Sequence, residues 1–440
     1  MMNHLASNKL FLVVPVFLFF IWYIGIGVFN QYSLDDYWHY SNVQIHGFWE
    51  AQNFYYQNWE GSFSHTFFAT LPHSKLFRYL FENNIWVYCV LTLGFLIFSI
   101  TITLFQFDIV TPRLTRLLVS SYIVSVLYVF STAQEDVLYW VCANITYVNS
   151  ISFLLVGLFI LKKFEYSRLK YIAILPLAFV VGNKINLGVL LFLLFTFLLF
   201  SKSFLNRHRF DDLFVLGFVF ILYLVNLFAL GNFVRLGQNM DNLSNEYSLF
   251  AIVSYRFWYI FIPFGVKSMV FIIPILTFIN DDFFKGLNLK LFSIFIFSYF
   301  LVECIIFEIA FKNWGPARCS IFCEFLLIPY CVAIWIKLIK PRLKIIPFFP
   351  IFIAVVFSVY NILYWKYFKV SMEYSKALKQ RISVINNSPK ANIVLQPLPE
   401  SGLIHSYGCN DEVWLNNVFA LCFDKKITIR VLNHATTNQR

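Results

Sequence analysis

Two adjacent carboxylates, Asp35 and Asp36, are the residues of this sequence best suited to acid–base chemistry, and they lie in the segment SLDDYWHY shortly after a long apolar run. Repulsion between paired carboxylates raises the pKa of one of them or recruits a cation. A carboxylate held just above a membrane could therefore deprotonate a sugar hydroxyl. The alternative is that the pair only ends a helix in water, as expected for Asp211 and Asp212.

A second polar segment, QEDVLYWVCANITYVNS, begins with Glu135 and also contains Trp140, Asn144 and Tyr147. Aromatic faces stack on sugar rings, and amide and acid groups bind hydroxyls, so the segment resembles a carbohydrate-binding surface. The alternative is an interfacial belt of aromatic residues, which membrane proteins commonly have.

Three cations, Lys184, Arg256 and Arg318, lie beside apolar runs on the side where basic residues are otherwise scarce. A lipid phosphate at headgroup depth would explain them, and snorkelling to ordinary headgroups is the alternative. Acidic residues inside apolar runs are costly, so we expect them to face an inner cavity or to pair with these cations. These acidic residues are Glu303, Glu308 and Glu324.

The composition indicates that such groups are held by an α-helical membrane bundle. Hydrophobic residues make up 59% of the 440 positions and charged residues 13%, with a mean hydropathy of +0.68. Several apolar runs could cross about 30 Å of hydrocarbon as helices. The run at 10–29 is longer than the apolar part of a signal peptide, so we expect a retained first span.

Pro, Asn and charge clusters divide the sequence into about eleven predicted spans. These are 10–29, 85–105, 117–131, 149–161, 171–182, 187–200, 213–231, 264–280, 291–310, 320–336 and 345–364. With a cytoplasmic N-terminus, the inner regions hold sixteen Lys and Arg residues, against seven in the outer loops before residue 366. This bias predicts that orientation and an external C-terminus.

Residues 1–365 then form a polytopic transmembrane domain, and residues 366–440 form an external domain. The long first loop, 31–84, is also external, as are shorter loops near 132–148, 183–186, 232–263 and 311–319. In the tail, ANIVLQPLP predicts a strand and DEVWLNNVFALCF a short helix, which together predict a small α/β cap.

Several function classes lack support in the sequence. The net charge of +11 is typical of the topological bias of membrane proteins, and no arginine-rich arm predicts a nucleic-acid partner. Nucleotide-binding and hydrolase motifs are missing from the sequence. Cys319 and Cys323 have no partner His or Cys at zinc spacing, so no metal site is predicted, although dependence on a divalent metal stays open.

The first external loop, with SLDDYWHY and then NWEGSFSHTF, resembles the GT-C class of membrane glycosyltransferases. More narrowly, EDVLYWVCANITYVNS, GNKINLGVLL, GPARCSIFCEF and the tail are similar to the serotype-converting O-antigen glucosyltransferases of enteric bacteria and their phages. This resemblance implies that Asp35 or Asp36 is the catalytic base and Glu135 an essential acid. Where such proteins often carry an acid, this chain has Lys184 and Asn186, which favours a contact with the donor's phosphate.

The resemblance implies transfer of a hexose, glucose being the expected one, from undecaprenyl phosphate to the O-antigen of lipopolysaccharide. The reaction would take place on the periplasmic face of the bacterial inner membrane, among membrane lipids and without a nucleotide sugar. One alternative is an O-antigen polymerase, which should place its main external loops mid-chain. The other is a transporter or flippase of lipid-linked sugars, which should show repeated halves.

Overall fold

A computed structural model of the chain describes residues 10–81, 84–110, 113–200, 209–241, 247–311, 317–339, 348–388, 392–395, 398–404 and 428–431. Most of the described residues lie in helices. Six helical stretches among them are long and apolar enough to cross a membrane: Ile85–Gln106, Val141–Lys163, Leu249–Phe271, Leu289–Ile309, Arg318–Ile339 and Phe349–Asn387.

A seventh span arises if the helices Asp211–Leu227 and Leu230–Gly237, which meet at a bend of 42°, count as one. Shorter apolar helices are Phe11–Gly27, Thr115–Phe130 and Ile185–Phe197. The predicted helical membrane protein is therefore confirmed, whereas the predicted number of eleven spans is not.

The helices of the bundle, in chain order, have the following bounds. They are α2 (Leu10–Gly27), α7 (Ile85–Gln106), α8 (Arg113–Phe130), α9 (Gln134–Tyr139), α10 (Val141–Ala143), α11 (Asn149–Lys163), α12 (Ile174–Val181), α13 (Ile185–Phe200), α14 (Arg209–Leu227), α16 (Leu249–Arg256), α17 (Ile262–Phe271), α18 (Asp281–Gly286), α19 (Leu289–Phe311), α20 (Ile321–Ile334), α21 (Phe349–Leu363) and α22 (Tyr367–Asn387). Three π-helical segments continue α10, α16 and α20: Asn144–Val148, Phe257–Phe261 and Trp335–Ile339.

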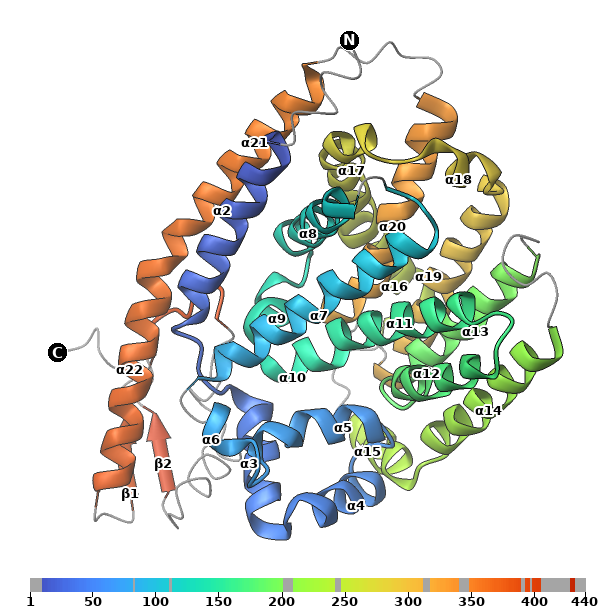
Figure 1. Cartoon of the computed structure of the whole chain (residues 1–440). Helices are drawn as coiled ribbons and strands as arrows, with labels where there is room; N and C mark the ends of the chain where they lie inside the picture. The colour runs from blue at the N-terminus through green and yellow to red at the C-terminus, as the bar shows by residue number, and fades with distance from the viewer. Residues whose placement is uncertain are drawn as a thin grey trace.

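A layer of short helices covers one end of the bundle, opposite the end from which α2 starts (Figure 1). Four of them come from the first loop: α3 (Leu34–His46), α4 (Phe48–Asn58), α5 (Phe63–Thr70) and α6 (Arg78–Phe81). A fifth, α15 (Leu230–Asp241), packs against α4. The described part of the loop predicted at 31–84 thus forms a helical cap over the bundle.

Two predicted loops are partly helical. The span expected at 149–161 begins at Val141, and the span expected at 264–280 begins at Leu249. In the first case the polar residues that predicted a loop are buried: the Asn144 amide donates to the Val137 carbonyl at 2.9 Å, and the Tyr147 hydroxyl lies 3.3 Å from the Cys319 sulfur. A helix tolerates such residues inside a membrane protein when other helices satisfy them.

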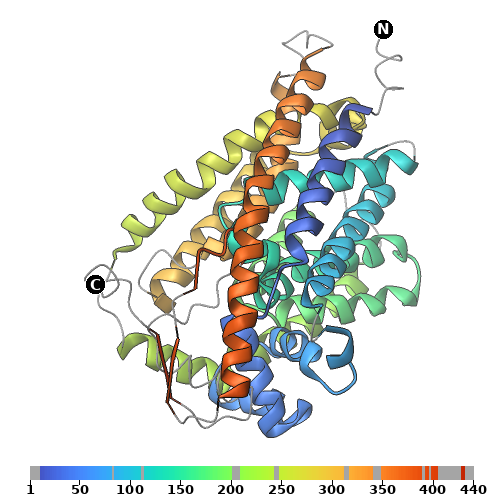
Figure 2. The same cartoon turned by 90° about the vertical axis from the view of Figure 1, so that its left-hand side faces the viewer.

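Hydrogen bonds from α2 to neighbouring helices hold the segment that leads into the cap. Trp22 on α2 donates from its indole to the Asn361 side chain of α21 at 2.8 Å, and these two helices run side by side in both views (Figures 1 and 2). The Tyr23 hydroxyl donates to the Leu138 carbonyl at 3.1 Å, and the Tyr139 hydroxyl donates to the Tyr23 carbonyl at 2.7 Å. These bonds hold the connection between α9 and α10 directly under the cap.

The tail contains a pair of parallel strands, β1 (Asn392–Leu395) and β2 (Thr428–Val431). β1 coincides with the strand predicted in ANIVLQPLP. The helix predicted in DEVWLNNVFALCF lies outside the described residues, so an α/β cap formed by the tail is not confirmed. The described part of the tail is attached to α22, where the Ser371 hydroxyl donates to the Ser401 carbonyl at 3.1 Å.

Candidate functional site

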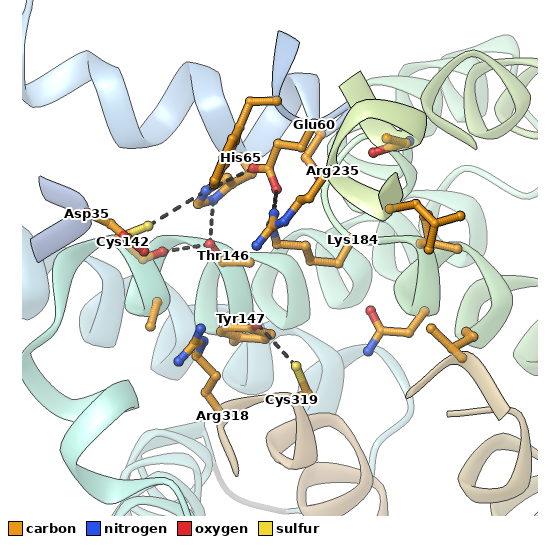
Figure 3. A pocket seen from close by; sticks show the side chains of 18 of the residues that line it. Asp35, Glu60, His65, Cys142, Thr146, Tyr147, Lys184, Arg235, Arg318 and Cys319 are labelled. Atoms are coloured by element: carbon orange, nitrogen blue, oxygen red, sulfur yellow. Dashed lines mark hydrogen bonds and ion pairs between the residues drawn. The ribbon is translucent and has the colours of Figure 1, made fainter. Parts of the chain in front are cut away.

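A cavity of about 840 Å³ lies between the helical cap and the bundle (Figure 3). Its polar lining comes from the cap, from the π-helical segment after α10, from the turn between α12 and α13, and from the start of the Arg318 span. The charged and aromatic residues among its lining are Asp35, Trp38, His39, Trp59, Glu60, His65, Trp140, Tyr147, Phe228, Phe233, Lys184, Arg235, Phe307 and Arg318.

The structure separates the roles of the two adjacent aspartates. Asp35 lines the cavity, whereas Asp36 does not. The Asp36 carboxylate accepts hydrogen bonds from the Ser33 amide at 2.9 Å and the Ser33 hydroxyl at 3.1 Å, which cap helix α3. It also accepts one from the Cys142 amide at 3.2 Å, which ties the cap to α10. Asp36 therefore holds the helix on which Asp35 is presented.

Burial acts on both carboxylates. It raises the pKa of Asp35 above its ordinary value, and the nearby Arg318 guanidinium opposes the rise. Burial raises the pKa of Asp36 to about 7, although its bonds from Ser33 and Cys142 favour the ionised form. A carboxylate with a raised pKa accepts a proton more readily than an ordinary one, and of the two only Asp35 reaches the cavity.

Glu60 is the centre of an ion-pair network on the cap side of the cavity (Figure 3). One carboxylate oxygen lies 2.8 Å from the Lys184 ammonium and 2.6 Å from the Arg235 guanidinium. The other oxygen lies 3.3 Å from Nε2 of His65. Although burial alone would raise it, the neighbouring cations Lys184 and Arg235 hold the pKa of Glu60 well below its ordinary value.

Two glycines allow Glu60 to reach this position. A Cβ on Gly231 would lie 2.6 Å from the backbone nitrogen of Glu60, and a Cβ on Gly61 would lie 2.4 Å from the Asn226 carbonyl oxygen. Any side chain at either position would therefore push the connection between α4 and α5 away from α15. The Asn232 side chain fixes the contact by accepting a hydrogen bond from the Gly61 amide at 2.9 Å.

Lys184 lies in a turn that is held by the buried side chains of Asn183 and Asn226. The Asn183 side chain donates to the Thr146 carbonyl at 2.9 Å and to the Ser150 hydroxyl at 2.6 Å. The Asn226 side chain donates to the Val181 carbonyl at 2.7 Å. These bonds join the turn to α11 and α14, so Lys184 enters the cavity from a rigid connection rather than from a mobile loop.

Arg318 enters from the opposite side of the cavity from Glu60 (Figure 3). Its guanidinium lies over the Trp140 ring, 4.7 Å from the centroid, and 3.6 Å from the Asp136 carboxylate. Burial raises the pKa of Asp136, and Arg318 opposes that rise. Tyr147, which the π-helical segment turns into the cavity, lies beside this pair, in keeping with the frequent occurrence of π-bulges at functional sites.

Not every predicted site residue reaches the cavity. Arg256 lies inside the bundle, 3.0 Å from the Glu303 carboxylate and 3.1 Å from the Ser320 hydroxyl, and is absent from the cavity lining. Asn144 is also buried outside the lining and bonds to the backbone of α9. The Glu135 side chain lies outside the described residues. The predicted residues that the cavity brings together are Asp35, Trp140, Tyr147, Lys184, Asn186 and Arg318.

Comparison of the chain with known protein families, with curated proteins and with solved structures finds no match. The cavity must therefore be interpreted from its own geometry and chemistry.

Several cavity residues were not predicted from the sequence. Glu60 and His65 lie in NWEGSFSHTF, where Glu60 is the single acidic residue. Arg235 lies in the predicted external loop at 232–263, and nothing in the local sequence distinguishes it from other loop cations. His39, His65 and Cys142, whose side chains meet in the cavity wall and could hold a metal ion, show no ligand spacing in the sequence.

Proposed function

We propose that the chain is a glycosyltransferase that moves a hexose from a polyprenyl phosphate to an acceptor sugar hydroxyl. One observation carries the proposal: a single cavity combines a carboxylate, Asp35, with three cations and with an apolar wall at the surface of the bundle. Each part matches one component of the reaction, namely the acceptor hydroxyl, the leaving phosphate and the lipid tail.

The cations supply the phosphate site. Lys184 and Arg235 keep 24% and 35% of their side-chain surface exposed, so they can bind a second anion while Glu60 holds them in place. Arg318 adds a guanidinium, whose several N–H donors can grip a phosphate in a bidentate manner. As the bond from the sugar to the phosphate breaks, negative charge grows on the phosphate, and fixed cations stabilise it.

The apolar wall supplies a place for the lipid. Phe228, Phe233 and Ile309 line the cavity and are exposed apolar side chains. Around a membrane protein such residues face acyl chains, so a polyprenyl tail could lie against them while its phosphate reaches Lys184 and Arg318. The apolar wall therefore favours a ligand with a lipid tail over a wholly water-soluble ligand.

The remaining lining supports a sugar ligand. Trp38, Trp59, Trp140 and Tyr147 offer aromatic faces, and Asn186 offers an amide for hydroxyl groups. Asp35 would accept the proton of the acceptor hydroxyl as it attacks the anomeric carbon. These roles agree with the resemblance to GT-C glycosyltransferases in SLDDYWHY and NWEGSFSHTF, which is the motive for naming undecaprenyl phosphate as carrier and O-antigen as acceptor.

The same proposal includes the location of the chain. We infer that it lies in a bacterial inner membrane with about eleven membrane-embedded helices, a cytoplasmic N-terminus and a periplasmic C-terminal segment. The charge bias supports a cytoplasmic N-terminus. The short helices of the cap lie at the end of the bundle opposite the start of α2, so this orientation puts the cap on the periplasmic side (Figure 1). The cavity would then open at the periplasmic face.

The test is the O-antigen of cells with and without the chain, followed by the purified protein in lipid nanodiscs with undecaprenyl-phosphate-linked hexose and O-antigen acceptor. We expect one additional hexose per repeat unit and release of undecaprenyl phosphate in the purified system. A polymerase would change the chain-length distribution without changing sugar composition. A flippase would move the lipid-linked sugar across the bilayer and form no glycosidic bond, so either result would overturn the proposal.

A further inference from the structure

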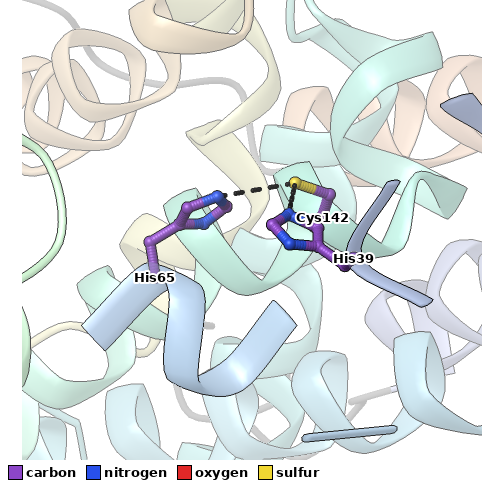
Figure 4. A group of neighbouring side chains, drawn as sticks. All are labelled: His39, His65 and Cys142. Atoms are coloured by element: carbon purple, nitrogen blue, oxygen red, sulfur yellow. Dashed lines mark hydrogen bonds between the residues drawn. The ribbon is translucent and has the colours of Figure 1, made fainter. Parts of the chain in front are cut away.

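Three buried side chains from different elements meet at one point of the cavity wall (Figure 4). His39 comes from α3, His65 from α5 and Cys142 from α10, and each is at most 5% exposed. Their ligand atoms all lie within 4.8 Å of one another. None of them is needed for the roles given to Asp35 and the cations, so the cluster calls for its own explanation.

The distances match a tetrahedral metal site. Nε2 of His39 and Nε2 of His65 each lie 3.7 Å from the Cys142 sulfur. Zinc binds thiolate at about 2.3 Å and imidazole at about 2.0–2.1 Å, which at a tetrahedral angle separates sulfur from nitrogen by about 3.6 Å. The two sulfur–nitrogen distances therefore match zinc coordination, and all three ligand atoms lie within 4.8 Å of one another.

The hydrogen bonds of His65 turn a nitrogen lone pair toward the sulfur. The Thr146 hydroxyl donates its proton to the Cys142 carbonyl at 2.6 Å, so it accepts from Nδ1–H of a neutral His65. Nε2 of His65 then presents a lone pair to the Cys142 sulfur and to the Glu60 carboxylate oxygen at 3.3 Å. A thiol proton on Cys142 or a metal ion bound to its thiolate would satisfy these facing lone pairs.

His39 is held in a comparable way. Its Nδ1 lies 2.9 Å from the Tyr55 hydroxyl, which also lies 3.5 Å from the Trp38 carbonyl and can donate to it. Metal-binding histidines are oriented by such a bond from the ring nitrogen that does not bind the metal. Both histidines thus have an outer partner and direct Nε2 to the same point.

We infer that His39, His65 and Cys142 bind a zinc ion. Imidazole and thiolate suit zinc, whereas magnesium and calcium prefer oxygen ligands. Three protein ligands leave one tetrahedral position for water or an anionic oxygen, the arrangement of zinc sites that take part in chemistry. Because all three residues line the cavity, that position is reached from the cavity. Zinc binding goes beyond the proposed function and can be measured without sugar transfer.

The first experiment uses the wild-type full-length protein in detergent, purified after zinc supplementation and again after exchange with cobalt. We expect about one zinc per chain by mass spectrometry of metals. The cobalt form should show the visible bands of a tetrahedral site and a sulfur-to-cobalt charge-transfer band. A metal content close to zero, or cobalt bound without a thiolate band, would overturn the inference.

Variants then identify the ligands. Cys142→Ser should lose the charge-transfer band and most of the metal, whereas Cys89→Ser, a matched change at another buried cysteine, should keep both. Thr146→Val, which removes the hydroxyl that bonds to His65 and to the Cys142 carbonyl, should weaken metal affinity about 10–100-fold. Equal metal content in the Cys142 and Cys89 variants would contradict the assignment even if both are folded. Because the wild-type spectrum alone can refute thiolate ligation, the inference stays testable if a variant fails to fold.

Discussion

Two acid–cation sites close to each other in this molecule differ in what surrounds them. Arg256 and Glu303 are 1% and 0% exposed and face each other within the bundle. Glu60 is also buried, but its partners Lys184 and Arg235 are partly exposed in the cavity. The two sites are neighbours, since Asn186 lines the cavity and donates to Glu303 at 3.5 Å.

The difference shows two possible roles for basic residues on the side where basic residues are scarce: a structural role in a buried ion pair, or a binding role in the cavity. Removing two charges from water is costly, and the attraction between Arg256 and Glu303 offsets part of that cost. Because both side chains are buried and neither lines the cavity, the pair is closed to a charged ligand in the cavity. Lys184 and Arg235 retain access to the cavity and can exchange part of their hydration for a phosphate. Among these cations, contact with the cavity distinguishes a binding role from a structural one.

The comparison predicts its largest effect on stability at Glu303. Glu303→Gln removes the carboxylate that Arg256 faces, and breaking a buried pair in this way costs about 3–5 kcal/mol. Glu60→Gln should cost less, about 1–3 kcal/mol, because water can reach Lys184 and Arg235. Thermal unfolding of both variants in detergent, followed by size-exclusion chromatography, measures the difference. Equal stability of the two variants would remove the distinction between the sites.

The next largest effect, a lower rate of sugar transfer, is expected on substitution of Arg318. Arg318→Ala should lower transfer from lipid-linked hexose about 10²-fold because one fixed donor to the leaving phosphate is lost. Arg318→Lys should have a milder effect, since it keeps the charge and loses the bidentate geometry. Saturation curves against the lipid donor, with protein amount matched by chromatography, provide the measurement. Unchanged turnover and donor affinity for Ala would mean that Arg318 only stabilises Asp136 and Trp140.

The smallest effect on chemistry is expected at Asp36. Asp36→Asn keeps a single oxygen acceptor for the Ser33 and Cys142 donors, so it should lower the free energy of unfolding by about 1–3 kcal/mol. The folded fraction should still transfer sugar at a rate near wild type, because Asp36 does not reach the cavity. Transfer rates normalised to folded protein test this, and a loss comparable to that of an Asp35 variant would contradict the separation of the two aspartates.

The sequence predicted those features that local patterns determine. Apolar runs predicted a helical membrane protein, and adjacent acids and outlying cations directed attention to Asp35, Lys184 and Arg318. It could not predict that Glu60 joins Lys184 and Arg235, because that contact depends on Gly61 and Gly231 bringing α15 against the cap. The phosphate role predicted for Arg256 is not supported by its position, since Arg256 is buried against Glu303 and does not line the cavity.

The helical cap illustrates the same limit. Tyr, Trp, His and Asn in 31–84 were expected in an external loop, and the short helices they form are stabilised by contacts that no local pattern contains. His39, His65 and Cys142 are far apart in sequence and follow no ligand motif, so their meeting depends on the packing of α3 and α5 over α10. Sites of this kind emerge only when the tertiary structure is known.

Asp35 provides the most direct test of the proposed transfer reaction. Asp35→Asn keeps the shape of the side chain but cannot accept a proton, so transfer from undecaprenyl-phosphate-linked hexose by the purified protein should fall about 10²-fold or more. The unfolding temperature and the saturation of donor binding should stay close to those of wild type, in contrast to Asp36→Asn. Transfer by Asp35→Asn at the wild-type rate would contradict the assignment of Asp35 as the base and the proposed chemistry of the cavity.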